Sequence, residues 1–349
     1  MNKRMILYIQ GAILLIEAAI MVLPIAAALI YREPSGIWFF YTALAAAICG
    51  FAAMKLSRPR TKTIYAKEGL ITVALGWIVL SLVGALPFTL SGEIPFYLDA
   101  VFEMISGFTT TGSSILPNVE ALSRCMLLWR SFSHWLGGMG ILVFMLAIVK
   151  MEGGQGIHLL RAESPGPTVG KMVPRMVDSS KILYTIYFAL TLVQVVFYLA
   201  GGMPLFDSLC NAFATAGTGG FSIKADSFAS YSPYLQTVTT VFMALFGVNF
   251  SIYFFLLQKK FDLAFKNTEL RWYVGIILFS IAMITANILP MYPDFHAAIH
   301  HAAFSVSSVI TTTGFGTENF DLWPEFSRVI LVFLMIVGAS AGSTGGGLK

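Results

Sequence analysis

Apolar residues in this 349-residue chain are gathered into long runs and do not alternate with polar residues. A helix of about 20 apolar residues is long enough to cross the hydrocarbon core of a bilayer. The pattern therefore predicts an all-α polytopic membrane protein. Its apolar runs lie at approximately 5–30, 37–56, 69–90, 126–149, 181–202, 235–257, 270–290 and 326–338.

Composition narrows the class of protein further. Hydrophobic residues make up 57% of the chain and charged residues 11%, whereas soluble domains carry about 25% charged residues. These values exclude a soluble enzyme, a nucleic-acid-binding protein and a disordered chain. An outer-membrane barrel is excluded as well, because its strands alternate apolar and polar residues.

The charged residues are distributed unevenly between the two sides of the membrane. Most of the 22 Lys and Arg residues fall at the N-terminus and in every second loop after it. Basic loops remain in the cytoplasm, so the N-terminus is predicted to be cytoplasmic. Most acidic residues fall in the opposite loops. An acidic outer face would raise the local cation concentration, but ordinary solvated loops would give the same count, and both interpretations stay open.

The outer segments contain a repeat. A short apolar stretch leads into a Gly/Thr cluster three times, and Asp99, Asp207 and His301 each stand thirteen residues before a glycine of that cluster. An apolar stretch of about ten residues is too short to span a bilayer and is typical of a re-entrant helix. Irregular backbone at membrane depth is tolerated where it lines a watery path. The sequence thus predicts repeated membrane–pore-loop–membrane units, similar to those of K⁺ channels, around a central pore.

The residue types in these clusters indicate which ion the path would carry. Glycine permits positive φ and close approach of several backbones, so carbonyl oxygens can be aimed inward. A ring of such oxygens replaces the hydration shell of a monovalent cation, whereas divalent cations prefer carboxylates. The clusters at 109–114, 217–222 and 311–316 contain no carboxylate. We therefore expect potassium ion uptake through a channel-like pore with a Gly/Thr selectivity filter.

Several motifs in the chain are specific to one family. They are GALPF (84–88), SGFTTTG (106–112), WLGGMG (135–140), RAESPGP (161–167), GGFS (219–222) and GASAGSTGGG (338–347). On these motifs the whole chain resembles the Trk/Ktr/HKT superfamily of potassium transporters. The two additional spans at 5–30 and 37–56 favour its Trk branch over its Ktr branch.

This resemblance implies four pore-loop repeats around one pore, each giving one filter strand. It also implies that glycine at every filter position selects potassium, and that no cofactor is needed besides the transported K⁺. The potassium-binding filter residues carried over by motif are Thr110, Thr111, Gly112, Thr218, Gly219, Gly220, Thr312, Thr313 and Gly314.

The resemblance further implies partners and a location. Members of the superfamily form homodimers with one pore per subunit, in contact with membrane lipid. A cytosolic regulator with nucleotide-binding RCK domains, similar to TrkA, docks on their inner face. We therefore expect a multi-pass protein of the bacterial inner (plasma) membrane that does not bind nucleic acid and is not an enzyme.

The glycine-rich run at 338–347 is predicted to break the last helix within the membrane. In the superfamily the equivalent segment is an intramembrane loop that gates the pore below the filter. The gating residues expected on this basis are Gly338, Gly342, Ser343, Thr344, Gly345, Gly346, Gly347 and Lys349.

The predicted organisation has four parts. Two N-terminal transmembrane helices occupy 1–62, pore repeat 1 occupies 63–152, and pore repeat 2 with a preceding cytoplasmic loop occupies 153–260. Pore repeat 3 occupies 261–349 and is cut within its last helix at the gating loop. A fourth repeat is expected after Lys349, and three loops alone are not expected to close a four-fold filter.

Other interpretations compete with this one. A cation-coupled secondary transporter of a different fold would use broken helices around a midplane site, but its repeats would be inverted. The helical spacing of His296, His300 and His301 would allow a metal site, although a structural role is favoured because few acidic ligands are near. Arg130, inside an apolar run, is expected either to pack between helices or to place a charge beside the pore.

Overall fold

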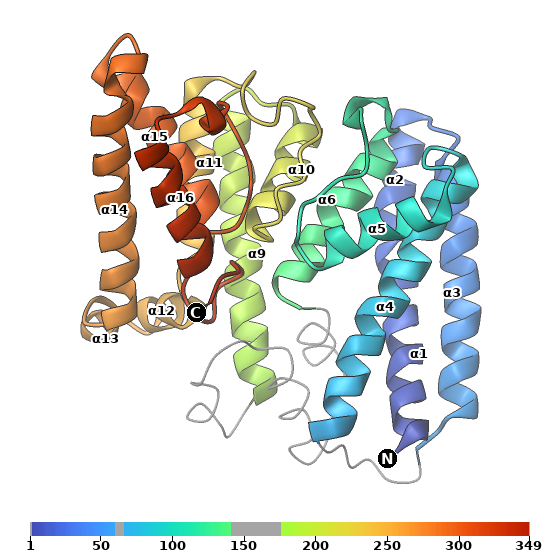
Figure 1. The fold of residues 1–349 in the computed structure, drawn as a ribbon. Coiled ribbons are helices and arrows are strands. Elements are labelled where there is room, and N and C mark those ends of the chain that lie inside the picture. Colours follow the sequence, from blue (N-terminus) through green and yellow to red (C-terminus); the bar gives the residue numbers. More distant parts are fainter. Residues whose placement is uncertain (1, 60–65, 141–175, 349) are drawn as a thin grey trace. The chain divides into compact units, whose positions relative to one another are not determined.

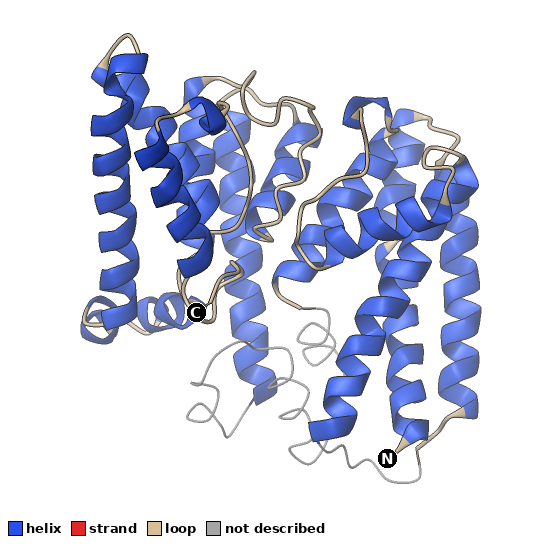
Figure 2. Cartoon of the chain, viewed as in Figure 1, coloured by secondary structure: helices blue, strands red, loops and turns tan. Residues whose placement is uncertain are grey.

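The computed structural model describes residues 2–59, 66–140 and 176–348, and this part of the chain is helical without any strand (Figures 1 and 2). The chain divides into two compact units, Met1–Lys181 and Ile182–Lys349. Each unit is described by itself below. The all-α class predicted from the apolar runs is confirmed.

Unit 1 combines long helices with a short one that packs on two of its neighbours. Its long elements begin with α1 (Lys3–Ile20) and α2 (Val22–Tyr31), which are interrupted only at Met21, and continue with α3 (Gly36–Leu56) and α4 (Ala66–Ser91). The short α5 (Tyr97–Phe108) packs on both α4 and α6 (Arg124–Gly138), and the 3₁₀ turn η1 (Val119–Ala121) lies between α5 and α6 (Figure 1). The predicted span at 126–149 begins as α6, and its part from 141 onward lies outside the described residues.

Two glycines bring α1 and α3 into close contact. A Cβ atom built on Gly11 would lie 2.7 Å from the carbonyl oxygen of Gly50, and a Cβ built on Gly50 would lie 2.7 Å from that of Gly11. Without a hydrophobic driving force inside lipid, helices associate through such close packing of small residues. The N-terminal helix pair is therefore held together where these backbones meet.

Unit 2 repeats the alternation of long and short helices. Its elements are α9 (Met176–Ala200) from Ile182 onward, α10 (Leu205–Ala216), α11 (Pro233–Phe246), α12 (Phe250–Leu257), α13 (Phe261–Phe265), α14 (Thr268–Ile288), η3 (Leu289–Met291), α15 (Phe295–Ile310), η4 (Phe320–Leu322) and α16 (Glu325–Val337). The short α10 packs on α11, and the short α15 packs on α11, α14 and α16 (Figure 1).

Two of the predicted spans are not single helices long enough to cross a membrane. The run at 235–257 was expected to be one span, but α11 and α12 meet at an angle of 89°. Gly247 ends α11, and the Asn249 side chain accepts the Ser251 N–H to start α12 in a new direction, a polar cap that an apolar-run count overlooks. The run at 326–338 was also expected to span, but α16 has 13 residues and a length of about 20 Å.

Five helices in the described residues are long and apolar enough to cross a membrane, and the bent pair α11–α12 adds a sixth if it is counted as one span. The five are Lys3–Tyr31, Gly36–Leu56, Lys67–Ser91, Lys181–Ala200 and Thr268–Met291. The prediction of a polytopic membrane protein is thus confirmed.

Substituting Gly50 by Val should loosen the contact between α1 and α3. The new methyl groups would meet the Gly11 carbonyl, and such overpacking costs about 1–3 kcal/mol, which lowers the melting temperature by several degrees. Thermal unfolding of the detergent-solubilised protein measures the effect. Gly275→Val in α14 is the matched control, since a Cβ there meets nothing within 4 Å. Equal melting temperatures for both variants would contradict the assignment.

Candidate functional site

The three predicted filter loops have the same backbone conformation. After each short helix a threonine adopts positive φ, at 55° for Thr110, 52° for Thr218 and 58° for Thr312. The glycine two residues later is also left-handed, with φ of 77° at Gly112, 79° at Gly220 and 85° at Gly314. A β-branched residue at positive φ is a genuine outlier and costs about 1–3 kcal/mol. Its recurrence at one position in all three loops marks a built feature.

Hydrogen bonds at the ends of the short helices enforce this conformation. The N–H groups of Thr111, Gly219 and Thr313 each donate back to the carbonyl five residues earlier, at 2.9 Å in every loop. This is the long bond of a Schellman cap, whose left-handed position is usually glycine. Threonine occupies it here. Because φ changes sign at alternate residues, neighbouring carbonyl groups can turn toward one side, which is the arrangement that cation filters use.

Within unit 2 the second and third loops lie against each other. A Cβ built on Gly220 would lie 1.9 Å from the carbonyl oxygen of Thr313, so only glycine fits. Farther along both loops, the Phe228 N–H donates to Gly316 O at 2.9 Å, and the Gly316 N–H donates to Ser227 Oγ at 3.2 Å. The structure therefore brings together two of the three loops that the sequence aligned.

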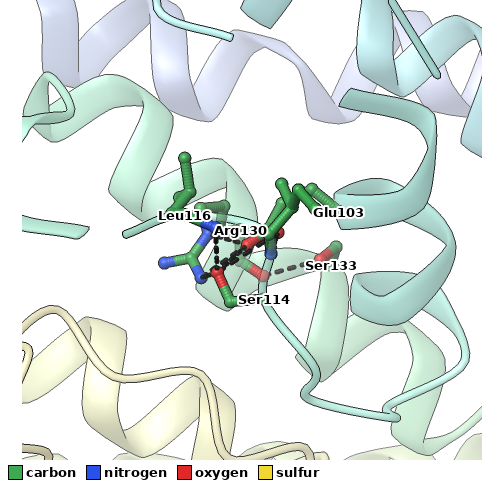
Figure 3. A network of polar contacts seen from close by, with 6 residues as sticks. Glu103, Ser114, Leu116, Arg130 and Ser133 are labelled. Carbon is green, nitrogen blue, oxygen red and sulfur yellow. Dashed lines mark hydrogen bonds and ion pairs between the residues drawn. The ribbon is translucent and has the colours of Figure 1, made fainter. Parts of the chain in front are cut away.

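The first loop, in unit 1, is held by a buried ion pair (Figure 3). Arg130 of α6 contacts the Glu103 carboxylate at 2.6 Å through its terminal nitrogen and 2.7 Å through Nε, and the two side chains are 1% and 0% exposed. Ser114 Oγ and the Ile115 N–H also donate to Glu103, at 3.0 and 2.9 Å. Of the two roles expected for Arg130, the structure supports packing between elements, because the guanidinium joins α6 to the short helix and to the loop that follows it.

Glu103 is a residue that the sequence analysis did not single out. It counted only as one of the acids on the outer side, yet its carboxylate accepts bonds from α6 and from the segment after Gly112. A carboxylate within a short apolar helix, followed by an arginine inside the next apolar run, was the available signal. Buried charges of this kind occur in pairs.

Two of the histidines of α15, His300 and His301, contact other side chains. His300 Nε2 lies 2.7 Å from Gln236 Oε1, and Gln236 Nε2 donates to Phe228 O at 2.8 Å. His301 Nδ1 lies 3.1 Å from Thr317 Oγ1, and its ring stacks on Tyr292. In the described part of the chain, no three His, Cys, Asp or Glu residues are grouped to hold a metal ion. These contacts favour the structural role over a metal site.

The glycine-rich run, here called the glycine segment (residues 338–348), follows α16 directly. The helix ends at Val337, as predicted, and Gly338 has φ of 69°. The segment folds back on itself, since the Ala339 N–H donates to Gly346 O at 3.0 Å. It also contacts loop 3, because the Gly346 N–H donates to Thr312 Oγ1 at 2.8 Å. Of the predicted gating residues, Lys349 lies outside the described residues.

The glycine segment also binds the break between α11 and α12. The Ser340 N–H donates to Gly247 O at 3.1 Å, and the Phe250 N–H donates to Gly342 O at 3.0 Å. Thr344 Oγ1 donates to Phe246 O at 3.2 Å. The bend therefore exposes backbone groups that would be paired within a straight helix, and the glycine segment binds them.

Short helices that end in tight Gly/Thr turns between longer apolar helices define a pore-loop membrane protein. The sequence pattern of the TrkH family, described as a cation transport protein, matches residues 38–349, and the chain belongs to this family. The resemblance inferred from the motifs is thereby confirmed.

Individual relatives agree with this assignment. The Trk system potassium uptake protein TrkH of Salmonella typhimurium is 36% identical over 355 residues, which cover 100% of this chain and 74% of the relative. The Trk system potassium uptake protein TrkG of Escherichia coli is 31% identical and is matched over 100% of this chain and 73% of its own length. Among solved structures, the potassium transporter TrkH from Vibrio parahaemolyticus superposes with a TM-score of 0.88 at 31% identity, over 100% of this chain and 73% of that one.

Removing Glu103 should destabilise unit 1 strongly. Glu103→Ala removes the carboxylate that forms the ion pair with the buried Arg130, and breaking such a pair costs about 3–5 kcal/mol. Thermal unfolding measures the loss. Glu325→Ala in α16 is the matched control, since its 3.9 Å contact with Arg328 is exposed and its loss should cost less than about 1 kcal/mol. A Glu103 variant as stable as the Glu325 variant would refute the role of the pair.

Proposed function

We propose that this protein takes up potassium ions across the bacterial inner membrane, with its N-terminus in the cytoplasm. The observation that carries the proposal is the repeated Thr–x–Gly conformation at Thr110, Thr218 and Thr312. The printed names of its relatives, potassium uptake proteins of the Trk system, support the same function. The driving force is the membrane potential, and the protein acts as a transporter without catalytic chemistry.

In this proposal the loops form the selectivity filter. Backbone carbonyl oxygens at 110–112, 218–220 and 312–314 bind dehydrated K⁺, and the glycine at the end of each strand keeps side chains out of the ring. The described residues of these loops contain no carboxylate, which fits a monovalent rather than a divalent cargo. Potassium is cargo here, and no cofactor is required.

Gating and partners form the second half of the proposal. The glycine segment obstructs the path below the filter and moves to open it, and its contact with loop 3 supports this placement. Its glycines impose few side-chain contacts, so its conformation can change at low cost. A homodimer regulated on its cytosolic face by an RCK-domain protein similar to TrkA completes the proposal.

Ion flux tests the proposed cargo. The protein reconstituted in liposomes should pass K⁺ and Rb⁺ at least roughly tenfold faster than Li⁺, which corresponds to about 1.4 kcal/mol of discrimination. Liposome flux assays, with a membrane potential set up without valinomycin, measure the ratio of the K⁺ or Rb⁺ flux to the Li⁺ flux. Equal rates for all three ions, or saturable uptake of an organic solute in place of K⁺, would end the proposal.

Selectivity should depend on Gly220 more than on Gly314. Both glycines have positive φ, so serine strains both, but only at Gly220 would the new Cβ meet a neighbouring strand, at Thr313 O. We expect Gly220→Ser to reduce the K⁺/Li⁺ flux ratio by roughly tenfold or more, and Gly314→Ser to reduce it less, because clash and strain add. If Gly220→Ser lowered the protein yield more than Gly314→Ser did, and neither changed the K⁺/Li⁺ flux ratio, the result would count against a filter role.

A further inference from the structure

Thr218 and Thr312, two of the left-handed threonines, differ in what their hydroxyl groups bind. Thr218 Oγ1 donates to the carbonyl of Gly217 at 2.7 Å, inside its own loop. Thr312 Oγ1 makes the equivalent bond to Thr311 O at 2.6 Å and also accepts the Gly346 N–H at 2.8 Å. The Thr312 hydroxyl is thus a bridge from the third filter strand to the glycine segment.

The glycine segment fits closely around this bridge. A Cβ on Gly345 would lie 2.9 Å from the Thr311 carbonyl oxygen, and one on Gly346 would lie 3.0 Å from Thr312 Oγ1. At its other end the segment is bound by Glu269 of α14, whose carboxylate accepts the Ala341 N–H and the Asn249 side-chain amide. Hydrogen bonds to Thr312, to Glu269 and to the break between α11 and α12 therefore hold the segment.

We infer that Thr312 is a positioning residue that couples the third filter strand to the glycine segment, an inference that rests on the proposed filter role of that strand. The hydroxyl ties the left-handed Thr312 both to the preceding carbonyl of its own strand and to the glycine segment. When the glycine segment leaves, Thr312 loses one partner and the strand loosens. Coupling between two sites is reciprocal, so a loosened strand releases the segment as well.

The second loop supplies an internal control for this inference. Thr218 has the same left-handed φ and the same bond to the preceding carbonyl, but within the described residues its hydroxyl has no bond to the glycine segment. A Val substitution at either position removes one hydroxyl and places an equally strained β-branched residue. Both variants lose the bond to the preceding carbonyl, so a difference between them reports the contact of position 312 with Gly346.

Hydrogen–deuterium exchange of the chain in lipid nanodiscs tests the coupling from the filter side. Thr312→Val should speed exchange in the peptide that covers 338–348 by roughly tenfold, since the Gly346 amide loses its acceptor. Thr312→Ser, which keeps the hydroxyl, should exchange like the native protein, and so should Thr218→Val in this peptide. Native exchange in Thr312→Val, or equal acceleration by Thr218→Val, would overturn the inference.

A second experiment tests the coupling from the side of the glycine segment, by removing the Glu269 carboxylate that binds Ala341. Glu269→Ala should speed exchange in the segment and also in the peptide covering 308–316, where the Thr313 N–H donates to Ser308 O. Glu325→Ala, a charge loss at an exposed position, should change neither peptide. Acceleration confined to the segment would overturn the coupling. Unchanged exchange in the peptides of α9 from Ile182 onward, which belong to the same unit as the substituted residues, shows that unit 2 of each variant is folded.

These measurements need no ion flux, so the two proposals fail separately. If flux shows no preference for K⁺ but exchange is coupled, the filter role falls and Thr312 still links the two segments. If flux prefers K⁺ and exchange is uncoupled, the filter role stands and the coupling falls.

Discussion

A left-handed turn placed directly after a short helix is the constraint on which the rest of this structure depends. Thr110, Thr218 and Thr312 each occupy a conformation that is costly for a β-branched residue. At membrane depth, the backbone groups of such a turn must either find partners inside the protein or face a watery path. The cap bonds to Ser106 O, Ala214 O and Ser308 O supply the first of these partners, and the surrounding elements supply the others.

The loops obtain their additional support by different means. In unit 1 a charged pair, Glu103 and Arg130, joins the short helix, the following loop and α6. Removing two charges from water is expensive, and the bonds from Ser114 and Ile115 to the same carboxylate offset part of that cost. In unit 2 the backbones of loops 2 and 3 support each other, an arrangement that requires a residue without Cβ at position 220.

Glycine has a second role at the ends of the longer helices. Gly137 lets α6 lie against the first loop, since a Cβ there would be 2.2 Å from Phe108 O, and Gly247 does the same for α11 beside Thr311 and Tyr273. Gly247 also ends α11 at the bend, which frees the backbone groups that bind Ser340. A single small residue thereby sets both the packing against loop 3 and the position of the glycine segment.

The sequence by itself determined the membrane class, the short helices and the three Thr–x–Gly turns, because apolar length and glycine position are local properties that a reader can count along the chain. It also showed where the last helix stops, since a run of glycines at 338–347 cannot continue one. Only the tertiary structure decided that Glu103 pairs with Arg130, that α11 and α12 meet at 89°, and that Gly346 binds Thr312. The two pairs join residues that are distant in the chain, so they depend on distances in space, and the bend depends on a polar cap at Asn249 that an apolar-run count overlooks.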